Sequence, residues 1–505
     1  MDVFNFLLEG FATALQPQNL MFAFLGALLG TVVGVLPGIG PTSGIAMLLP
    51  LTTVLEPTPA LIMLAGIYYG AMYGGSTTAI LVNIPGEISS VPTALDGYKM
   101  ARQGRAGPAL SIAAISSFVA GTLSLVGLTF FAPSLASMAL AFGPPEYVGL
   151  MILALSVVIS LSGKSIIKGL ITALLGLGVA TIGLDPMTGV ARFTFNNTNL
   201  LAGIEFISVI IGLFAISEIL LNAEQAVTTV FAQKLKGLMP TKQDLKDITG
   251  PTLRSTVIGF FLGLIPGCSP GVVAFLAYDA EKRLSKNPEK FGTGAVEGVA
   301  APEGANNACT SGGFVPLMAF GIPSGPALSV LLGGFLMYGL QPGPGLFEKN
   351  PEFVWALIAS MYIGNVMLLI LNLPLVGLWA SMLRVPYPVL APVILVLCFI
   401  GAYSVRDSIF DVWVAVLFGI LGYIMKKLDY PATPLVLCTI LANMLEVSLK
   451  QTLMMSQGSF FILFSRPISL TLISLAVILT GLTLYARYGK SETARSLVNV
   501  GEDTD

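Results

Sequence analysis

The sequence contains no histidine, and this absence excludes several kinds of site at once. Without imidazole there is no histidine-ligated zinc, no Ser-His catalytic pair and no histidine proton relay. Cysteines number only four and form no Cys-x-x-Cys pair, so neither a disulfide framework nor a thiolate metal site is indicated. We therefore expect no cofactor, and an enzyme is disfavoured. The cysteines, interpreted as small apolar membrane residues, are Cys268, Cys309, Cys398 and Cys438.

Charge is also scarce, because only 10% of the residues are charged while 55% are hydrophobic. A soluble fold cannot cover its surface with so few polar side chains. Apolar runs recur along nearly the whole chain, whose length is sufficient for roughly ten to twelve spans of about 20 residues each. The sequence therefore predicts an all-α polytopic membrane protein with one transmembrane domain over residues 1–505, surrounded by lipid and without a nucleic-acid partner.

A glycine-proline cassette occurs twice inside the apolar sequence. The first copy, GVLPGIGP, covers residues 34–41, and the second, GLIPGCSP, covers residues 263–270. A helix cannot continue through Pro-Gly followed three residues later by another proline. Broken helices at corresponding places in two halves of a membrane protein are typical of a transporter's binding site.

A second pair of matched segments follows the cassettes. Residues 70–78 read GAMYGGSTT and precede an Ile-Pro-Gly break at residues 84–86. Residues 304–313 read GANNACTSGG and precede an Ile-Pro-Ser-Gly break at residues 322–325. Both segments are small and polar in apolar surroundings. Two matched elements in the same order indicate an internal duplication.

The basic residues predict which loops face the cytoplasm. They gather at residues 99–105, 164–168, 234–254 and 282–290, whereas the N-terminal segment and the loop around Glu56 have none. The first cassette is then entered from the outer face and the second from the basic face. This predicts two re-entrant hairpins in an inverted repeat. One miscounted span between them would make the repeat parallel instead.

The predicted parts of the transmembrane domain follow from these patterns. They are a first repeat core over residues 18–108, a second over residues 253–345, a cytoplasmic loop over residues 222–252 and a polar C-terminal tail over residues 488–505.

The chemistry of a broken helix predicts the binding residues. In hydrocarbon, irregular backbone persists only where protein or a water-filled cavity surrounds it. Its free N–H groups suit an anion and its free carbonyls suit a cation, while glycine permits close approach and hydroxyl or amide side chains add ligands. The predicted substrate- and ion-binding residues are Gly38, Gly40, Pro41, Thr42, Ser43, Gly74, Gly75, Ser76, Thr77, Thr78, Gly267, Ser269, Pro270, Asn306, Asn307, Thr310 and Ser311.

A simpler interpretation of the same residues is packing. Small residues allow helices to approach closely, as the four-residue spacing of Gly26, Gly30 and Gly34 indicates, and Ser, Thr and Asn join helices by hydrogen bonds. Both interpretations remain open for each small polar side chain.

Carboxylates within apolar sequence are treated separately, because intramembrane acids usually serve function. Glu87 and Glu303 adjoin the small polar segments and are candidates for contact with a coupling ion or proton. Their alternative is a carboxylate in water at a helix end or loop. Three others near span ends are expected to be interfacial or paired: Glu205, Glu218 and Glu446. No basic residue is placed inside a span, so an anion would be held mainly by helix N-termini and hydroxyls.

Four segments together carry a family resemblance: residues 36–41, 265–270, 69–76 and 185–195. They resemble the large membrane subunit of the tripartite tricarboxylate transporters (TctA type), and the likeness covers most of the chain. The resemblance implies a multi-pass permease of the bacterial inner membrane, with a small membrane subunit and a periplasmic solute-binding protein as partners. It also implies uptake of citrate or related carboxylates, driven by an ion gradient, usually of sodium, without ATP.

The leading hypothesis is thus a secondary active carboxylate importer that works by alternating access. A passive channel is the alternative, since duplicated hairpins also build channels. A structural scaffold would leave the costly helix breaks unexplained. In the outer loop, Asp185 and Arg192 are expected to form either a partner contact or a loop salt bridge.

Overall fold

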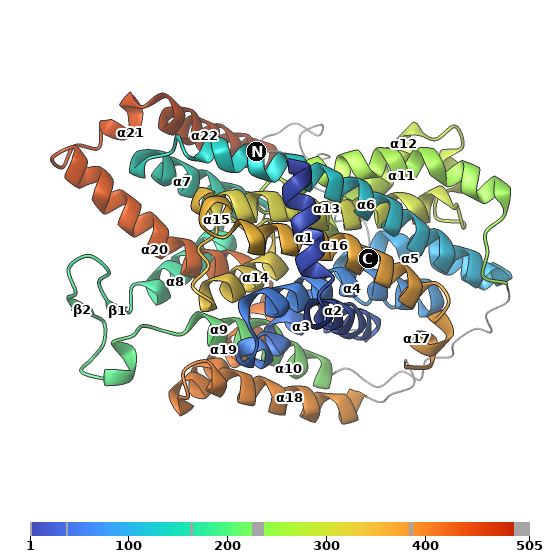
Figure 1. The fold of residues 1–505 in the computed structure, drawn as a ribbon, viewed down its shortest axis with the longest axis horizontal. Coiled ribbons are helices and arrows are strands. Elements are labelled where there is room, and N and C mark those ends of the chain that lie inside the picture. Colours follow the sequence, from blue (N-terminus) through green and yellow to red (C-terminus); the bar gives the residue numbers. More distant parts are fainter. Residues whose placement is uncertain (1–2, 37–38, 162–164, 225–236, 383–386, 489–505) are drawn as a thin grey trace.

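The computed structural model describes residues 3–36, 39–161, 165–224, 237–382 and 387–488. This part of the chain is almost entirely helical (Figure 1), and its strands are limited to a hairpin of β1 (Gly183–Leu184) and β2 (Ala191–Arg192). Seven of the described helices are long and apolar enough to cross a membrane, and five shorter apolar helices accompany them. The predicted all-α polytopic membrane fold is therefore confirmed.

The first cassette forms a helical hairpin, as the sequence predicted. α2 ends at Val35 and α3 begins at Gly40, whose φ of +64° favours glycine. Pro37 and Gly38, at the tip, lie outside the described residues. The elements of this repeat are α2 (Pro17–Val35), α3 (Gly40–Leu48), η1 (Leu49–Val54), α4 (Pro57–Val82), η2 (Ile88–Ser90) and α5 (Val91–Met100).

The second cassette forms the corresponding hairpin. Its tip turns at Gly267, which has a φ of +85° and donates its N–H to the carbonyl of Ser324 at 3.0 Å. This bond ties the tip to the break that follows α13. The elements of this repeat are α11 (Lys242–Gly263), α12 (Pro270–Leu284), η6 (Pro288–Lys290), α13 (Glu297–Phe320) and α14 (Pro326–Met337).

Glycines hold α2 and α4 in backbone contact. A methyl group on Gly26, Gly30 or Gly34 would lie 2.3–2.4 Å from a carbonyl oxygen of α4. The oxygens facing them belong, in order, to Met63, Ile67 and Ala71, so the two helices run parallel. The packing role that the sequence predicted for these three glycines is confirmed.

In the second repeat, glycines hold α11 against α13 in the same way as they hold α2 against α4 in the first. Gly259 and Gly263 face the carbonyl oxygens of Ala305 and Cys309 at 2.4 and 2.6 Å from an added Cβ. Gly312 faces the Phe260 carbonyl just as Gly74 faces that of Thr31 in the first repeat. This equivalence sets the register between the repeats. The positions of Tyr68, Tyr69 and Ala65 in α4 correspond to those of Asn306, Asn307 and Glu303 in α13.

The two repeats are inverted relative to each other. α4 and α13 cross antiparallel, because Ser76 donates to Glu303 while Tyr69, earlier in α4, donates to Ser311, later in α13. Two bonds bring together the loops that the sequence predicted to be cytoplasmic: Arg105 to Asp244, and Gln103 to the carbonyl of Thr293. The N-termini of α11 and α13 therefore lie at the same end of the molecule as the C-terminus of α5.

The loop before α11 is shorter than the predicted 222–252. Helix α11 begins at Lys242, because Thr241 and Asp244 form a capping box and Arg105 holds the Asp244 carboxylate at 2.7 Å. Residues 225–236 of this loop and residues 489–505 of the predicted tail lie outside the described residues.

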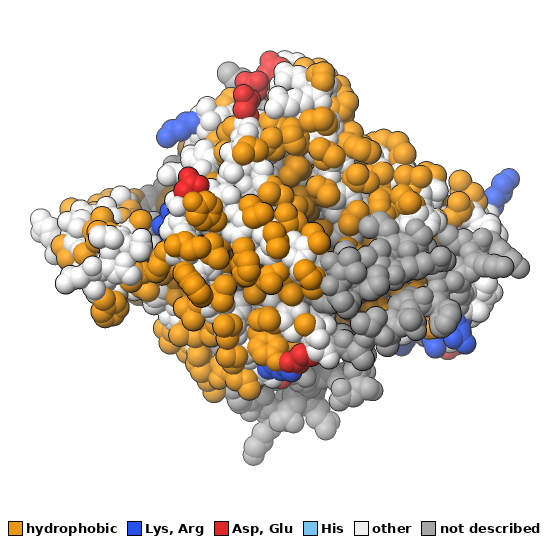
Figure 2. All heavy atoms as spheres, turned by 90° about the horizontal axis from the view of Figure 1, so that it is seen from below, with side chains coloured by type: hydrophobic (Ala, Val, Ile, Leu, Met, Phe, Trp, Pro, Cys, Tyr) orange, Lys and Arg blue, Asp and Glu red, His pale blue; other side chains and the backbone are white. Residues whose placement is uncertain are grey.

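The other helices surround the two repeats (Figure 1). α6 packs on α13, and α16 contacts α1, α4 and α6. Figure 2 shows a broad apolar face of the molecule. Exposed apolar side chains of the surrounding helices include Val396, Trp413 and Leu417. Such a face suits contact with lipid. The remaining helices are α1 (Val3–Ala14), η3 (Ala101–Arg105), α6 (Ala106–Ala139), α7 (Pro144–Leu161), α8 (Ile166–Ala180), η4 (Thr198–Leu200), α9 (Phe206–Ile210), η5 (Ile211–Ile216), α10 (Ser217–Ala223), α15 (Pro344–Lys349), α16 (Pro351–Asn372), α17 (Val376–Met382), α18 (Tyr387–Ser404), α19 (Ile409–Lys427), α20 (Ala432–Met455), α21 (Ile462–Ser465) and α22 (Pro467–Tyr488).

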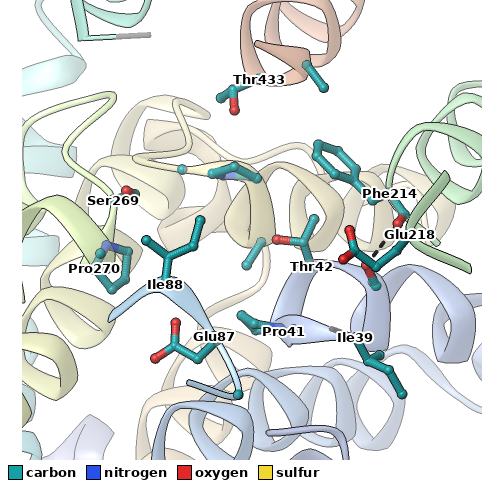
Figure 3. Close-up of a pocket in the computed structure, with 18 of the residues that line it drawn as sticks. Ile39, Pro41, Thr42, Glu87, Ile88, Phe214, Glu218, Ser269, Pro270 and Thr433 are labelled. Carbon is teal, nitrogen blue, oxygen red and sulfur yellow. Dashed lines mark hydrogen bonds between the residues drawn. The ribbon is translucent and has the colours of Figure 1, made fainter. Parts of the chain in front are cut away.

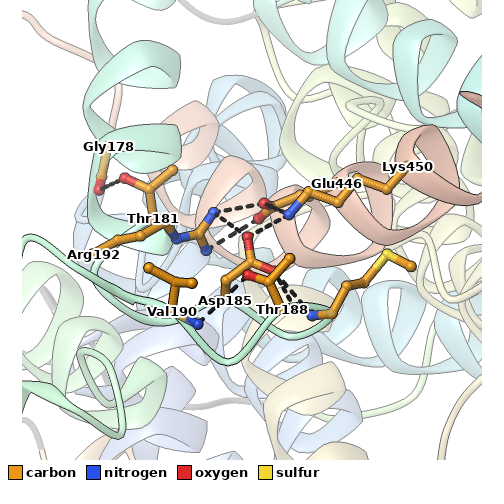
Figure 4. Close-up of polar contacts among 9 residues, drawn as sticks. Gly178, Thr181, Asp185, Thr188, Val190, Arg192, Glu446 and Lys450 are labelled. Carbon is orange, nitrogen blue, oxygen red and sulfur yellow. Dashed lines mark hydrogen bonds and ion pairs between the residues drawn. The ribbon is translucent and has the colours of Figure 1, made fainter. Parts of the chain in front are cut away.

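An ion-pair network fastens the β1–β2 hairpin to α20 (Figure 4). Arg192 lies 3.3 Å from Asp185 and 2.5 Å from Glu446, and Lys450 pairs with both acids. The Asp185 carboxylate also accepts the N–H groups of Met187 and Thr188 at 2.9 Å. The loop salt bridge considered from the sequence is thus present, and Glu446 is paired as expected.

The network predicts how the outer loop responds to acid. The Lys450 ammonium, helped by the N–H groups of Thr188 and Met187, holds the pKa of Asp185 well below its usual range. A lowered folded-state pKa contributes stability above the unfolded pKa near 4, which is lost as the pH falls through the folded value. We expect the hairpin to stay closed between pH 4 and 7 and Asp185→Asn to open it at pH 7.

Limited proteolysis of the purified protein measures this opening. Asp185→Asn should be cleaved several-fold faster within residues 181–205 than the unchanged protein. The matched control is Asp407→Asn, because Asp407 is exposed and joins no ion pair among the described residues. Equal cleavage of the two variants would contradict the prediction.

Candidate functional site

The two cassettes meet at one cavity of about 670 Å³. Residues 39–43 line it from the first cassette and residues 269–271 from the second, while Tyr68 and Met72 line it from α4. Figure 3 shows Pro41 and Thr42 on one side and Ser269 and Pro270 on the other. The inverted repeat therefore brings together two segments that are far apart in the sequence, at a volume usual for a small-molecule site.

Four helices begin at this cavity. The first-turn residues of α3, α12, α14 and α20 all line it, and among the described residues no side chain caps any of these N-termini. Proline begins three of them at the first or second helical position, where its missing N–H removes no helix bond. The first-turn N–H groups and the positive ends of four helix dipoles thus converge on one space, an arrangement that favours an anion. The lining residues are Gly40, Pro41, Thr42, Ser43, Pro270, Gly271, Pro326, Ala327, Ala432 and Thr433.

One ion pair lies in the wall of the cavity. Lys426, in the last turn of α19, pairs with Glu218 of α10, and each side chain is about 25% exposed. Glu218 is paired, as the sequence predicted. Lys426 was not predicted as a site residue, because the sequence analysis places no basic residue inside a span. The sequence feature that could have identified Lys426 is its position directly after an apolar run.

The cavity lies near the end of the molecule that the basic residues mark. Lys168, in a loop predicted to be cytoplasmic, donates to the Leu428 carbonyl at 2.6 Å and lies over the ring of Tyr430. Tyr430 and Lys426 line the cavity. Away from the cavity, where α14 ends, the hydroxyl of Tyr338 donates to the carbonyl of Thr52. The part of the cavity wall that contains Lys426 and Glu218, here called the charged rim, therefore belongs to the half of the molecule predicted to face the cytoplasm.

Glu87 and Glu303 occupy different surroundings. Glu87 lines the large cavity and caps η2, accepting the N–H of Ser89 at 3.0 Å. Glu303 is only 1% exposed and lies in the first half of α13. The alternative of a loop carboxylate in water is therefore wrong for Glu303. It lines a second, much smaller cavity together with Ser76 and Thr77.

The predicted site residues divide into three sets. Lining the large cavity are Gly40, Pro41, Thr42, Ser43, Ser269 and Pro270. Lining the small one are Ser76 and Thr77. Lining neither cavity are Gly267, at the tip of the second hairpin, and the residues packed between helices, which are Gly74, Gly75, Thr78, Asn306, Asn307, Thr310 and Ser311. Gly38 lies outside the described residues. The binding roles themselves stay predictions.

Two residues of the packed set have a contact that gives them a structural role. Gly74 faces the Thr31 carbonyl at 2.4 Å from an added Cβ, so its size serves the contact of α2 with α4. Ser311 accepts the Tyr69 hydroxyl at 2.8 Å and thus joins the repeats. Within the described residues, no group of three or more His, Cys, Asp or Glu side chains is placed to hold a metal ion.

Comparison with known proteins identifies the family. Residues 20–437 match the Tripartite tricarboxylate transporter TctA family. The chain belongs to this family. The resemblance drawn from the cassettes is thereby confirmed, and both cassettes, the two cavities and Lys426 lie inside the matched range. Membership makes the protein a component of a tricarboxylate transporter of the tripartite kind, with several membrane spans.

Two relatives of this TctA-family chain come from Agrobacterium vitis. One, described as "Uncharacterized 52.8 kDa protein in TAR-I ttuC' 3'region", is 47% identical over 478 residues, which are 94% of this chain and 95% of the relative. The other, "Uncharacterized protein in TAR-II ttuC' 3'region", is 42% identical over 226 residues, 45% of this chain and 93% of the relative. No solved structure matches the chain.

Proposed function

We propose that this protein is the large membrane subunit of a secondary active importer of di- or tricarboxylates, such as citrate. The observation that supports this most directly is the convergence of four helix N-termini on one cavity. A carboxylate accepts hydrogen bonds from such free N–H groups and is stabilised by the positive helix ends. Several N-termini around one space suit an anion with more than one carboxylate group.

Lys426 supplies a positive charge in the same cavity. Its pairing with Glu218 reduces the cost of holding a lysine there without substrate. A carboxylate substrate competes with Glu218 for the ammonium group, and the charge-assisted hydrogen bond adds to the binding energy. The cavity thereby combines fixed backbone N–H donors with the ammonium group of Lys426, which can exchange Glu218 for the substrate.

The inverted repeat supports alternating access as the mechanism. Each repeat places one hairpin tip at the cavity, and inverted repeats permit exchange between an outward-facing and an inward-facing arrangement. The position of the charged rim in the predicted cytoplasmic half suits substrate release on that side. In this proposal, a periplasmic solute-binding protein delivers the substrate, and a small membrane subunit completes the complex in the bacterial inner membrane. An inward gradient of Na⁺ drives import.

Uptake into proteoliposomes tests the proposal. Labelled citrate and other di- and tricarboxylates are offered to vesicles that contain this protein with the small subunit and the binding protein, with and without an inward sodium gradient. We expect accumulation above the external concentration that requires the gradient and the binding protein. Equilibration that ignores the gradient would favour a channel instead, and absence of carboxylate flux under all conditions would contradict the proposed substrate class.

A further inference from the structure

We propose that the small cavity beside Glu303 is a binding site for a single Na⁺ ion, separate from the carboxylate cavity. The inference rests on the proposed function only for the ion's role in transport. The site itself rests on the side chains that surround Glu303.

Glu303 is surrounded by hydroxyl groups from three helices. Its Oε1 accepts Ser76 of α4 at 2.6 Å and Thr93 of α5 at 2.5 Å, and its Oε2 accepts Ser117 of α6 at 3.2 Å. Among the described residues, no lysine or arginine pairs with it. A buried carboxylate without a countercharge is costly even when it is hydrogen-bonded, and a bound cation removes that cost.

A fourth helix contributes an amide side chain to the lining of the same cavity. Asn372, at the end of α16, lines the cavity with Glu303, Ser76 and Ser117 and is only 6% exposed. Its Nδ2 atom donates to Leu368 and Thr31, while its Oδ1 atom has no hydrogen-bond donor among the described groups. An acceptor oxygen buried without a donor costs free energy unless something positive meets it. This independent feature indicates a cation.

The size and ligand chemistry select a small monovalent ion. The cavity volume is about 10 Å³, close to the lower limit for a single water molecule. Apart from the Asn372 amide nitrogen, the side-chain polar atoms of the lining residues are oxygens, the ligand type of hard cations, and among the described residues Glu303 is the one carboxylate in the lining. A Ca²⁺ site usually contains more negative charge and more room. Na⁺ fits these limits better than the larger K⁺.

The first repeat has no carboxylate at the position that corresponds to Glu303. By the register of the repeats, Ala65 takes the position of Glu303, and a cavity of the same 10 Å³ lies beside it. Glycine and apolar side chains line most of that cavity, with Ser360 and Tyr69 as its polar residues and no carboxylate. The structure therefore places one such cation site in the molecule rather than a symmetric pair, within the described residues.

The position of the site connects the ion to the substrate. Ser76 belongs to α4, which also lines the large cavity through Tyr68 and Met72. Thr93 follows η2, whose capping residue Glu87 lines that cavity. An ion at Glu303 would join α4 and α5 of one repeat to α13 of the other. Binding of Na⁺ would thus favour the arrangement in which both repeats contribute to the carboxylate cavity, and the two ligands would bind cooperatively.

Sodium binding without substrate tests the site directly. Purified full-length protein is titrated with NaCl at constant ionic strength, with choline as the replacing cation, while labelled-sodium binding and the melting temperature are recorded. We expect saturable binding of one ion and a rising melting temperature. Li⁺ should reproduce the shift in part and K⁺ should not. A melting temperature that ignores Na⁺, together with no bound sodium, would overturn the proposal.

Variants locate the ion. Glu303→Gln keeps the size of the side chain and should raise the half-saturating Na⁺ concentration at least about tenfold, as expected for loss of a charged ligand. Ser117→Ala, which is better tolerated if the glutamine variant fails to fold, should raise it about threefold by removing one oxygen. The matched control is Ser360→Ala, which removes a hydroxyl that lines the cavity of the same volume beside Ala65. Unchanged sodium affinity in Glu303→Gln or Ser117→Ala would overturn the assignment.

The experiments distinguish failure of the proposed sodium site from failure of the proposed transport function. Sodium binding that depends on Glu303, without any carboxylate uptake, would support the ion site and contradict the importer. Carboxylate uptake driven by sodium but unaffected in affinity for Na⁺ by Glu303→Gln and Ser117→Ala would support the importer and contradict this site.

Discussion

Replacing Gly86 by alanine (Gly86→Ala) is expected to abolish carboxylate uptake, to below about a tenth of the unchanged rate, while leaving membrane insertion intact. An added Cβ at Gly86 would lie 1.9 Å from the carbonyl oxygen of Gly34 and 2.7 Å from the Cα of Gly75. Both neighbours are backbone atoms, so a side-chain rotation cannot relieve the contact. Overpacking of this kind costs about 1–3 kcal/mol or more.

The effect on function follows from what the junction joins. Gly86 donates its N–H to the Gly75 carbonyl at 3.3 Å and lies directly before Glu87 and Ile88 in the cavity wall. Moving it separates the end of α2, the middle of α4 and the break that leads to α5. Because the apolar spans are unchanged, insertion is expected to proceed normally.

Uptake into proteoliposomes and the melting temperature together test this prediction. The matched control is Gly364→Ala, because an added Cβ at Gly364 meets nothing within 4 Å although the residue also lies in a core helix. That variant should retain its uptake. Full uptake by a correctly inserted Gly86→Ala protein would show that the junction tolerates displacement and is not part of the site.

Replacing Lys426 by methionine is expected to raise the apparent KM for the carboxylate about 10- to 100-fold, which corresponds to the loss of one charge-assisted hydrogen bond. The remaining Glu218 carboxylate would then repel an anion in the same cavity. Glu218→Gln should act in the opposite direction and lower the apparent KM, because the substrate no longer competes for the ammonium group.

The neighbouring lysine supplies the control for this experiment. Lys427 lies in the same helical turn and pairs with Glu224 instead, and it is not among the residues that line the cavity. Lys427→Met should therefore leave the apparent KM within about twofold, the range usual for surface ion pairs. If Lys426→Met and Lys427→Met change KM equally, or if Glu218→Gln raises it, then Lys426 does not contact the substrate.

The prediction from sequence succeeded where the signal is local. Pro-Gly with a following proline breaks a helix wherever it occurs, so both hairpins were predicted at their correct positions. Four-residue glycine spacing places three glycines on one side of α2, which is where α4 packs. The order of the segments was sufficient to indicate a repeat.

Sequence analysis could not separate residues that line the cavity from residues that are packed between helices. Gly40 and Gly74 have the same chemistry, yet one begins a helix at the cavity and the other faces the Thr31 carbonyl. Asn306 and Asn307 were predicted as ligands by composition, yet neither lines the large or the small cavity, although Asn306 corresponds in the repeat to Tyr68, which lines the large one. Which face of a helix meets a cavity depends on its neighbours, and those neighbours are distant in the sequence.

Composition and local backbone chemistry by themselves determined that this protein lies in a membrane, that two of its helices are broken, and that the breaks are duplicated. Only the tertiary structure decided that the four helix N-termini meet, that Lys426 joins them, and that Glu303 lies apart among hydroxyl groups. The physical reason is the range of the interactions. Helix breaking acts over a few residues, whereas a buried charge is stable only where partners from other helices surround it.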